Sequence, residues 1–501
     1  MARIPAALLP MLLAVSGAGA AAEDVRVIKV DEPLVSSTLL GFNAEPTTQE
    51  CQKALSGMNA TTLRMGGDMG HWSAPQGGQL DAVRNGYKQW DKQDVIANWA
   101  AANGMKPIFQ LAYTPAWSNV KTREKYKYPN DPQRPWLMDF CPPDDPAVWK
   151  EMSKAIMSRY KGKVFHYEVW NEPNTGFYFQ GEIFGATAGT KNANLAAAGR
   201  EELTQRYVDL CKATFEAARE VDPGIKVYTA CPHNDFFGDW LNAVFAKGLA
   251  QYSDGICLHI YVGPLCMAAF DNWWPKYLEV VSAVEAAQKK RYPLVLTEYG
   301  TDRHDSGALS LTQLTAMLGS FRVELLTQFL FFDPKTQAQG ADMFAVFVGS
   351  YADSANTRTL RQVYSLFKDA RYGPLNGASM TPGGEYYTEG GVPPKPDNKF
   401  HAFDVTKADG TRAAYVAAWR GRFCYGKGKL IDIPDMAVTI KLPGAYSSAD
   451  EIDTASGELR PFKEYQSAGN ETSFSLTLKG IKDGKEGAPR AFIFRRAPAA
   501  K

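Results

Sequence analysis

The stretch Phe165-His-Tyr-Glu-Val-Trp-Asn-Glu-Pro-Asn174 is a short run of strand-forming residues that ends at Asn171-Glu172-Pro173. Because proline stops further strand pairing, the pattern predicts a buried strand with Glu172 at its end. A second run, Pro293-Leu-Val-Leu-Thr-Glu-Tyr-Gly300, places Glu298 at the end of another strand. Between residues 39 and 348, such short strands alternate with longer amphipathic stretches, which is typical of a parallel β/α architecture.

Eight strands and seven helices are predicted in this region. The strands are Leu39 to Ala44, Thr62 to Met65, Pro107 to Ala112, Phe165 to Trp170, Lys226 to Ala230, Gly255 to Ile260, Leu294 to Glu298 and Met343 to Val348. The helices are Thr47 to Ser56, Trp90 to Asn103, Ala147 to Tyr160, Leu203 to Val221, Phe237 to Gly248, Trp274 to Lys289 and Leu309 to Leu326. Eight β/α units predict a TIM barrel.

The pattern changes after a last helix near Thr359 to Ala370 and a segment rich in Gly and Pro. Phe400 to Lys407 and Arg412 to Arg420 flank Ala408-Asp409-Gly410, which indicates a hairpin. Further alternating strands follow at Ala437 to Leu442, Thr472 to Leu478 and Pro489 to Arg495. We expect an α/β protein with a catalytic barrel over residues 23–372 and a β-sandwich over residues 373–501, which Val25 to Val30 also joins.

The first 22 residues have the features of a cleavable signal peptide. Arg3 supplies a positive charge, Ala6 to Val15 is apolar, and Ala18-Gly19-Ala20 gives the small-residue cleavage pattern. No later stretch reaches the roughly 20 apolar residues of a membrane span. We therefore expect a secreted or periplasmic protein without stable membrane insertion.

The composition limits the partners of the protein. A formal net charge of +1 over 501 residues favours neither nucleic acid nor an anionic membrane. The seven cysteines show no CxxC spacing and only six histidines accompany them, so no metal and no other cofactor is expected. Disulfide pairing and oligomeric state stay open.

Two carboxylates at the mouths of barrel strands suit a particular chemistry. Glu172 and Glu298 are separated by about three β/α units, which places them on opposite walls of one barrel. Glycosidic bonds are cleaved by such a pair, with one carboxyl acting as acid and then base. In retaining enzymes the second carboxyl, about 5 to 5.5 Å away, attacks the anomeric carbon.

Asn171-Glu172-Pro173 and Thr297-Glu298-Tyr299-Gly300 resemble the signature of clan A glycoside hydrolases, and the chain is most similar to family 39. The resemblance extends over nearly the whole mature chain, through Gly41-Phe-Asn-Ala-Glu45, Leu63-Arg-Met65, Leu111-Ala-Tyr-Thr-Pro-Ala-Trp117 and His259-Ile-Tyr261. It implies a retaining hydrolase that cleaves β-type O-glycosidic bonds of an extracellular polysaccharide or oligosaccharide by double displacement.

The resemblance also implies the roles of individual residues. Glu172 is the acid/base, Glu298 is the nucleophile, and Asn171 donates a hydrogen bond to the sugar 2-hydroxyl. This chemistry requires a raised pKa at Glu172 and an ionised Glu298. Tyr261 and Arg64 are expected to donate hydrogen bonds to Glu298.

Other residues have two interpretations each. His259 either contacts the sugar or is a hydrogen-bonded barrel histidine, and Glu168, deeper on the same strand as Glu172, is expected to pair with Arg64 in the interior. Aromatic or imidazole rings in the mouth loops either stack on sugar or pack within the loops; these are Trp117, Tyr113, His71, Trp72 and Tyr178.

Phe347 marks a departure from the family pattern. Many clan A enzymes have a tryptophan at the end of strand 8, where this chain has Phe344-Ala-Val-Phe-Val348. Phe347 is expected to take its place or to leave the subsite open, which makes an exo-acting β-xylosidase an alternative rather than the leading hypothesis. A non-catalytic carbohydrate-binding or exopolysaccharide-biosynthesis partner and a metal-dependent hydrolase are further alternatives.

Overall fold

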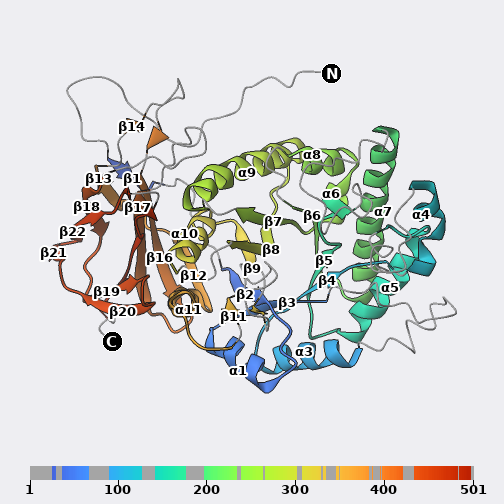
Figure 1. Cartoon of the computed structure of the whole chain (residues 1–501), viewed down its shortest axis with the longest axis horizontal. Helices are drawn as coiled ribbons and strands as arrows, with labels where there is room; N and C mark the ends of the chain where they lie inside the picture. Colours follow the sequence, from blue (N-terminus) through green and yellow to red (C-terminus); the bar gives the residue numbers. More distant parts are fainter. Residues whose placement is uncertain are drawn as a thin grey trace.

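The structure is a computed structural model of the 501-residue chain. It describes residues 25–29, 37–66, 90–114, 116–126, 141–176, 197–233, 238–262, 266–301, 307–328, 331–333, 346–348, 350–382, 386–387, 395–396, 398–420, 434–482 and 485–497. The expected signal peptide lies outside these residues. Two bodies lie side by side in Figure 1, a barrel surrounded by helices and a smaller domain made of antiparallel strands.

Eight parallel strands form a closed barrel, which confirms the predicted fold. In barrel order they are β2 (Leu39–Asn43), β3 (Thr62–Gly66), β4 (Ile108–Leu111), β5 (His166–Val169), β6 (Lys226–His233), β7 (Gly255–Val262), β8 (Leu294–Thr301) and β9 (Val323–Gln328). Strand β9 pairs with β2 and closes the ring. At Gly41 the two neighbouring strands approach so closely that a Cβ atom would lie 1.9 Å from the carbonyl oxygen of Thr62.

Helices cover the outside of the barrel (Figure 1). They are α1 (Gln49–Gly57), α3 (Trp90–Ala102), α4 (Val120–Tyr126), α5 (Pro146–Arg159), α6 (Pro173–Gly176), α7 (Ala197–Val221), α8 (Asp239–Ala246), α9 (Cys266–Gln288), α10 (Gly307–Leu318) and α11 (Ala355–Phe367), with 3₁₀ turns η2 (Ala116–Ser118) and η4 (Leu249–Tyr252). Helix α5 begins with two favourable residues, because Asp145 accepts a hydrogen bond from the backbone of Ala147 and Pro146 occupies the first turn. Among the helices described, none is long and apolar enough to cross a membrane.

The eighth barrel strand differs from the sequence prediction. We expected a helix as far as Leu326 and a strand at Met343 to Val348. Instead, α10 ends at Leu318, and β9 follows directly. Phe321, with φ of 53°, ends the helical turn between them. The prediction was wrong because a short apolar run such as Leu325-Leu326 fits a buried strand and a buried helix equally well.

In the described part of the segment predicted as the eighth strand, residues 346–348, Phe347–Val348 form β11, which pairs in parallel with β10 (Phe332–Asp333) in a two-stranded sheet separate from the barrel.

Two antiparallel sheets form the C-terminal domain, as predicted. One contains β1 (Arg26–Val27), β13 (Ser379–Thr381), β18 (Met436–Pro443), β22 (Glu471–Leu478) and β21 (Gln466–Ala468) in that order. The other contains β12 (Ala370–Pro374), β16 (Asn398–Lys407), β17 (Arg412–Arg420), β25 (Arg490–Arg495), β19 (Ser448–Asp453) and β20 (Glu458–Phe462). Two further short pairs are β14 (Tyr386–Tyr387) with β15 (Lys395–Pro396) and β23 (Ile481–Lys482) with β24 (Lys485–Glu486).

The six-stranded sheet shares its core with the barrel. Its buried Phe403, Tyr415 and Trp419 belong to the same hydrophobic cluster as the barrel side chains. The ring of Phe367 on α11 lies 5.7 Å from that of Tyr415, and the hydroxyl groups of Tyr415 and Thr315 on α10 are hydrogen-bonded at 2.7 Å. The opposite face of this sheet packs on the five-stranded sheet to form a separate sandwich core.

Candidate active site

Glu172 and Glu298 meet at the carboxyl-terminal end of the barrel. Glu172 directly follows β5, and Glu298 lies in β8. The backbone turns sharply before the helix α6, because Trp170 has φ of 70° and Glu172 has φ of 45°. Such left-handed conformations cost roughly 1–3 kcal/mol each in non-glycine residues and concentrate at functional sites. The turn directs Glu172 into the barrel mouth.

The two carboxylates are close to each other and to His259. The nearest donor and acceptor atoms of Glu172, His259 and Glu298 all lie within 4.8 Å of one another. His259 Nδ1 lies 2.9 Å from Glu172 Oε1 and 3.5 Å from Glu298 Oε2. The carboxylates are therefore about as close as in retaining glycosidases, where the separation is about 5 to 5.5 Å. They are closer than in inverting glycosidases, where it is roughly 6.5–9.5 Å.

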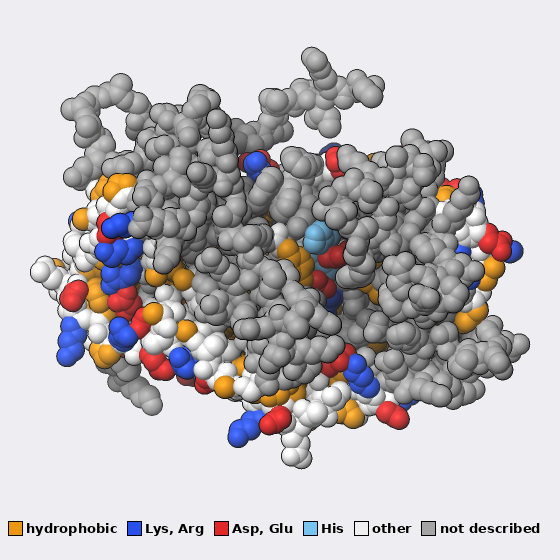
Figure 2. Space-filling view, in the orientation of Figure 1, with side chains coloured by type: hydrophobic (Ala, Val, Ile, Leu, Met, Phe, Trp, Pro, Cys, Tyr) orange, Lys and Arg blue, Asp and Glu red, His pale blue; other side chains and the backbone are white. Residues whose placement is uncertain are grey.

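The site is open to solvent at its outer side. The side chain of Glu172 is 17% exposed, whereas that of His259 is fully buried. Figure 2 shows a histidine and acidic side chains gathered near the middle of one face of the molecule. Because Glu172 is the more exposed of the two side chains, a ligand from solvent reaches it before it reaches His259.

Two hydrogen-bond donors face Glu298. The hydroxyl group of Tyr261 lies 2.5 Å from Oε2, and Arg64 Nη1 forms an ion pair with Oε1. Burial, together with the charge of Glu298, raises the pKa of Tyr261 well above its ordinary value, so its hydroxyl stays protonated and donates. Charge-assisted hydrogen bonds of this kind are short and directional, so they fix the orientation of the Glu298 side chain.

Arg64 connects Glu298 to the interior of the barrel. Its Nε and Nη2 atoms donate to the two oxygens of the fully buried Glu168, at 2.9 Å and 2.7 Å. Burial opposes the charge of Glu168, but the charge of Arg64 and a hydrogen bond from His259 lower its pKa to about 2. Glu168 is thus an interior carboxylate that is paired, as expected.

Asn171 is oriented by two donors. Its Oδ1 atom accepts from Arg64 Nη2 at 3.0 Å and from Gln110 Nε2 at 2.7 Å. Because the oxygen end of the amide is fixed in this way, the NH₂ end points in the opposite direction. That orientation suits donation to a sugar hydroxyl.

A second histidine, His233, contacts Glu172 and was missed by the sequence analysis. Its Nδ1 atom lies 2.9 Å from Glu172 Oε1, and its ring stacks on Tyr261 with centroids 5.8 Å apart. The backbone N–H and carbonyl of His233 are both bonded at 2.8 Å to the side chain of Asn174. The predicted strand ended at Ala230, whereas β6 continues through an irregularity to His233.

The pKa of Glu172 differs in direction from the expectation. Burial tends to raise this pKa, but hydrogen bonds from His233 and His259 outweigh burial and lower it below its ordinary value. We expected a raised pKa because the sequence did not show that two imidazoles lie beside this carboxyl. The local donors, rather than the degree of burial, decide the direction.

The predicted aromatic contacts are placed only in part. Trp117 in η2 and Tyr113 are half-buried, and the ring of Tyr113 meets Trp170 edge-on at 5.4 Å. Phe347 is 3% exposed and packs against Phe331 at 5.2 Å, so it lies in an aromatic core cluster. Three further candidates, His71, Trp72 and Tyr178, lie outside the described residues. Contact of these side chains with sugar stays a prediction.

No protein-family model matches the chain. Among solved structures, a family 39 glycoside hydrolase from Bacteroides cellulosilyticus WH2 aligns with a TM-score of 0.57 and 15% identity, over 92% of this chain and 81% of that one. A monomeric β-xylosidase from Caulobacter crescentus CB15 aligns with a TM-score of 0.51 and 16% identity, over 95% of this chain and 99% of that one. A family 30 endoxylanase from Clostridium papyrosolvens C71 aligns with a TM-score of 0.53 and 13% identity, over 95% of this chain and 100% of that one.

Two of these structural neighbours are glycoside hydrolases of families 39 and 30, and the third is a β-xylosidase. The resemblance inferred from the glutamate motifs is thereby confirmed at the level of the fold. At identities this low, the similarity concerns the barrel and its β-domain rather than the substrate.

Proposed function

We propose that this protein is a retaining glycoside hydrolase that cleaves β-type O-glycosidic bonds. The observation that carries the proposal is the approach of Glu172 and Glu298 to within 4.8 Å at the mouth of the barrel. Two carboxyl groups at this spacing leave no room for a water molecule between the sugar and the second carboxylate, which therefore acts as the nucleophile.

The reaction has two steps. In the first, Glu298 attacks the anomeric carbon and forms a glycosyl ester while Glu172 gives its proton to the departing glycosidic oxygen. In the second, Glu172 takes a proton from water, and the resulting attack on the anomeric carbon releases the sugar and restores Glu298.

The neighbouring side chains support these roles. Tyr261 and Arg64 hold Glu298 as a carboxylate directed toward the substrate. Both imidazoles bond to Oε1 of Glu172 and lower its pKa, so we assign the transferable proton to the other oxygen, Oε2, which takes it up when bound sugar excludes water from the carboxyl. Asn171 would donate to the sugar 2-hydroxyl, an interaction that strengthens in the transition state.

The proposed substrate is a neutral extracellular polysaccharide or oligosaccharide. The near-zero net charge and the expected export of the chain support this class. The structural neighbours include both a β-xylosidase and an endoxylanase, so release of terminal sugars and internal cleavage are both compatible with this fold.

The test begins with a panel of β-linked polysaccharides and aryl β-glycosides on the full mature chain. Once turnover is found, Glu298→Ala should abolish it, and Glu172→Ala should reduce it by roughly 10² to 10⁴-fold on substrates with poor leaving groups. Azide should rescue both variants, with an inverted glycosyl azide from Glu298→Ala and a retained one from Glu172→Ala. The exposed Glu45, paired with Lys92, provides the control variant Glu45→Ala.

Unchanged turnover in Glu298→Ala, or an inverted first product by NMR, would refute the mechanism. Glycan binding without turnover of any β-linked substrate would instead support the alternative of a non-catalytic carbohydrate-binding partner. Amino-terminal sequencing of the secreted protein tests the expected cleavage after about residue 22.

A further inference from the structure

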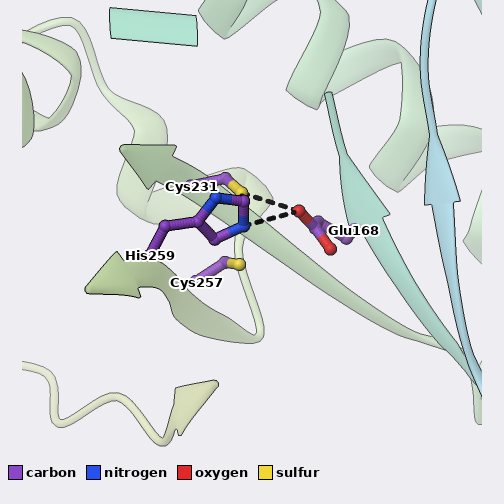
Figure 3. A group of neighbouring side chains, drawn as sticks. All are labelled: Glu168, Cys231, Cys257 and His259. Atoms are coloured by element: carbon purple, nitrogen blue, oxygen red, sulfur yellow. Dashed lines mark hydrogen bonds and ion pairs between the residues drawn. The ribbon is translucent and has the colours of Figure 1, made fainter. Parts of the chain in front are cut away.

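A cluster of four side chains lies beneath the catalytic carboxylates. Its sulfur, nitrogen and oxygen atoms are of the kinds that bind zinc. Glu168 on β5, Cys231 on β6, and Cys257 and His259 on β7 converge in the barrel interior (Figure 3). All four are completely buried, and one donor atom of each lies within 4.8 Å of the others. The two thiols have no role in the proposed sugar chemistry.

The backbone is distorted to bring Cys231 to this position. Ala230 and Cys231 have φ of 77° and 40°, and the pairing of β6 with β7 shifts register at this point. Two successive left-handed non-glycine residues cost roughly 1–3 kcal/mol each. The interior layers of a TIM barrel are usually filled by branched apolar side chains, which need no such distortion.

The spacing of the donor atoms fits a tetrahedral ion. With the bond lengths of zinc, neighbouring ligand atoms lie roughly 3.3 to 3.8 Å apart. His259 Nε2 lies 3.3 Å from Cys231 Sγ and 3.6 Å from Glu168 Oε1. The shorter contact of 2.6 Å between Cys231 Sγ and Glu168 Oε1 is a thiol hydrogen bond, which lengthens when the thiol loses its proton.

The groups around the cluster have the arrangement that supports metal ligands. A ligating histidine usually donates its other ring N–H to a carboxylate, and ligating carboxylates are themselves hydrogen-bonded. Here His259 Nδ1 lies 2.9 Å from Glu172 Oε1, and Arg64 Nε donates to Glu168 Oε2 at 2.9 Å. The hydroxyl group of Thr297 lies 3.0 Å from Cys257 Sγ and 2.9 Å from His259 Nε2, and an ion on Nε2 would replace the second of these hydrogen bonds.

We propose that Cys231 Sγ, Cys257 Sγ, His259 Nε2 and Glu168 Oε1 form a closed zinc site. Binding of Zn²⁺ displaces one proton from each thiol. The two thiolates balance the charge of the ion, and Arg64 balances Glu168. The cysteine spacing predicts no metal centre, but the four donors come from three different strands, and linear spacing does not reveal such a set.

The site links strands β5, β6 and β7, and it has a consequence for the catalytic residues above it. With zinc on Nε2, the N–H of His259 is fixed on Nδ1, where it faces Glu172. Because the site is fully buried, the ion must be acquired while the chain folds. The proposal does not depend on the glycosidase assignment, since metal content is measured without substrate.

The test is the metal content of the full mature chain, expressed without a histidine tag in zinc-supplemented medium. We expect about one zinc per chain, and less than about one tenth in Cys231→Ser/Cys257→Ser. Cys51→Ser is the matched control, because Cys51 is also buried but lies on α1 outside the cluster. Its zinc content should equal that of the unaltered chain.

A second measurement covers the case in which the double variant fails to fold. The unaltered chain expressed with Co²⁺ should show thiolate-to-cobalt charge-transfer absorption and the visible bands of tetrahedral cobalt. The proposal is overturned if the unaltered chain contains no stoichiometric zinc, if cobalt gives no thiolate bands, or if zinc is equal in the double variant. A Cys231–Cys257 disulfide, detected by mass spectrometry, would also overturn it.

Discussion

Arg64→Lys is expected to weaken both the barrel and the active site, although the positive charge is kept. Arg64 is 6% exposed and donates five hydrogen bonds, two to Glu168 and one each to Glu298, Asn43 and Asn171. A lysine ammonium group has three donors and no planar fork, so at least two bonds are lost. At about 1–2 kcal/mol for each acceptor left without its partner, the expected loss of unfolding free energy is about 2–4 kcal/mol.

The measurement is urea unfolding of the full chain, with secondary structure followed by circular dichroism. Arg159→Lys is the matched control, because Arg159 also makes a two-bond pair, with Asp94, but its side chain is 40% exposed. An exposed ion pair contributes less than about 1 kcal/mol to the free energy of unfolding. The reasoning is refuted if both lysine variants lose the same free energy, or if Arg64→Lys loses less than about 1 kcal/mol.

Three further outcomes are expected. Burial and nearby lysine charges lower the pKa of His166 from 6.5 to about 4. The unfolded chain therefore binds more protons in this range, so about 3 kcal/mol of stability present above pH 6.5 is lost as the pH falls toward 4, and His166→Gln should flatten the pH dependence of unfolding. Tyr261→Phe removes a hydrogen bond to the charged Glu298 and should lower kcat/KM by roughly 10- to 100-fold, and a smaller change than twofold would contradict its proposed role. Gly41→Ala brings a methyl group against the backbone of β3 and should cost about 1–3 kcal/mol or more in thermal unfolding, whereas Gly57→Ala, which meets nothing within 4 Å, should stabilise by about 0.4–1 kcal/mol.

Periodicity was sufficient for most of the barrel and for the sandwich hairpin. Seven of the eight strands lie within a few residues of their predicted positions, because each is an isolated apolar run bounded by polar or Gly-containing turns. Gly410, with φ of 85°, turns the hairpin between β16 and β17 as the Asp-Gly pair indicated. The eighth strand was lost because only a short turn separates it from α10.

The site could be predicted where a residue stands in a recognisable motif or on an expected strand. Glu172 and Glu298 stand in short recognisable motifs, Arg64 lies on β3, whose pairing is regular, and Tyr261 belongs to the His259-Ile-Tyr261 motif on β7. His233 and Cys231 reach the site through a local irregularity in β6. Such an irregularity changes the face of the sheet on which the following side chains lie. The alternation of apolar and polar residues in the sequence does not reveal it.

The core shared by the barrel and the six-stranded sheet has a practical consequence for the construction of chimeric proteins. Phe403, Tyr415 and Trp419 of the sheet are packed into the same cluster as the barrel helices. A barrel fragment that stops at residue 372 would therefore leave a broad apolar surface on α10 and α11 in contact with water. The sandwich therefore belongs to the same folding unit as the barrel, and chimeras of this architecture should exchange the two domains together.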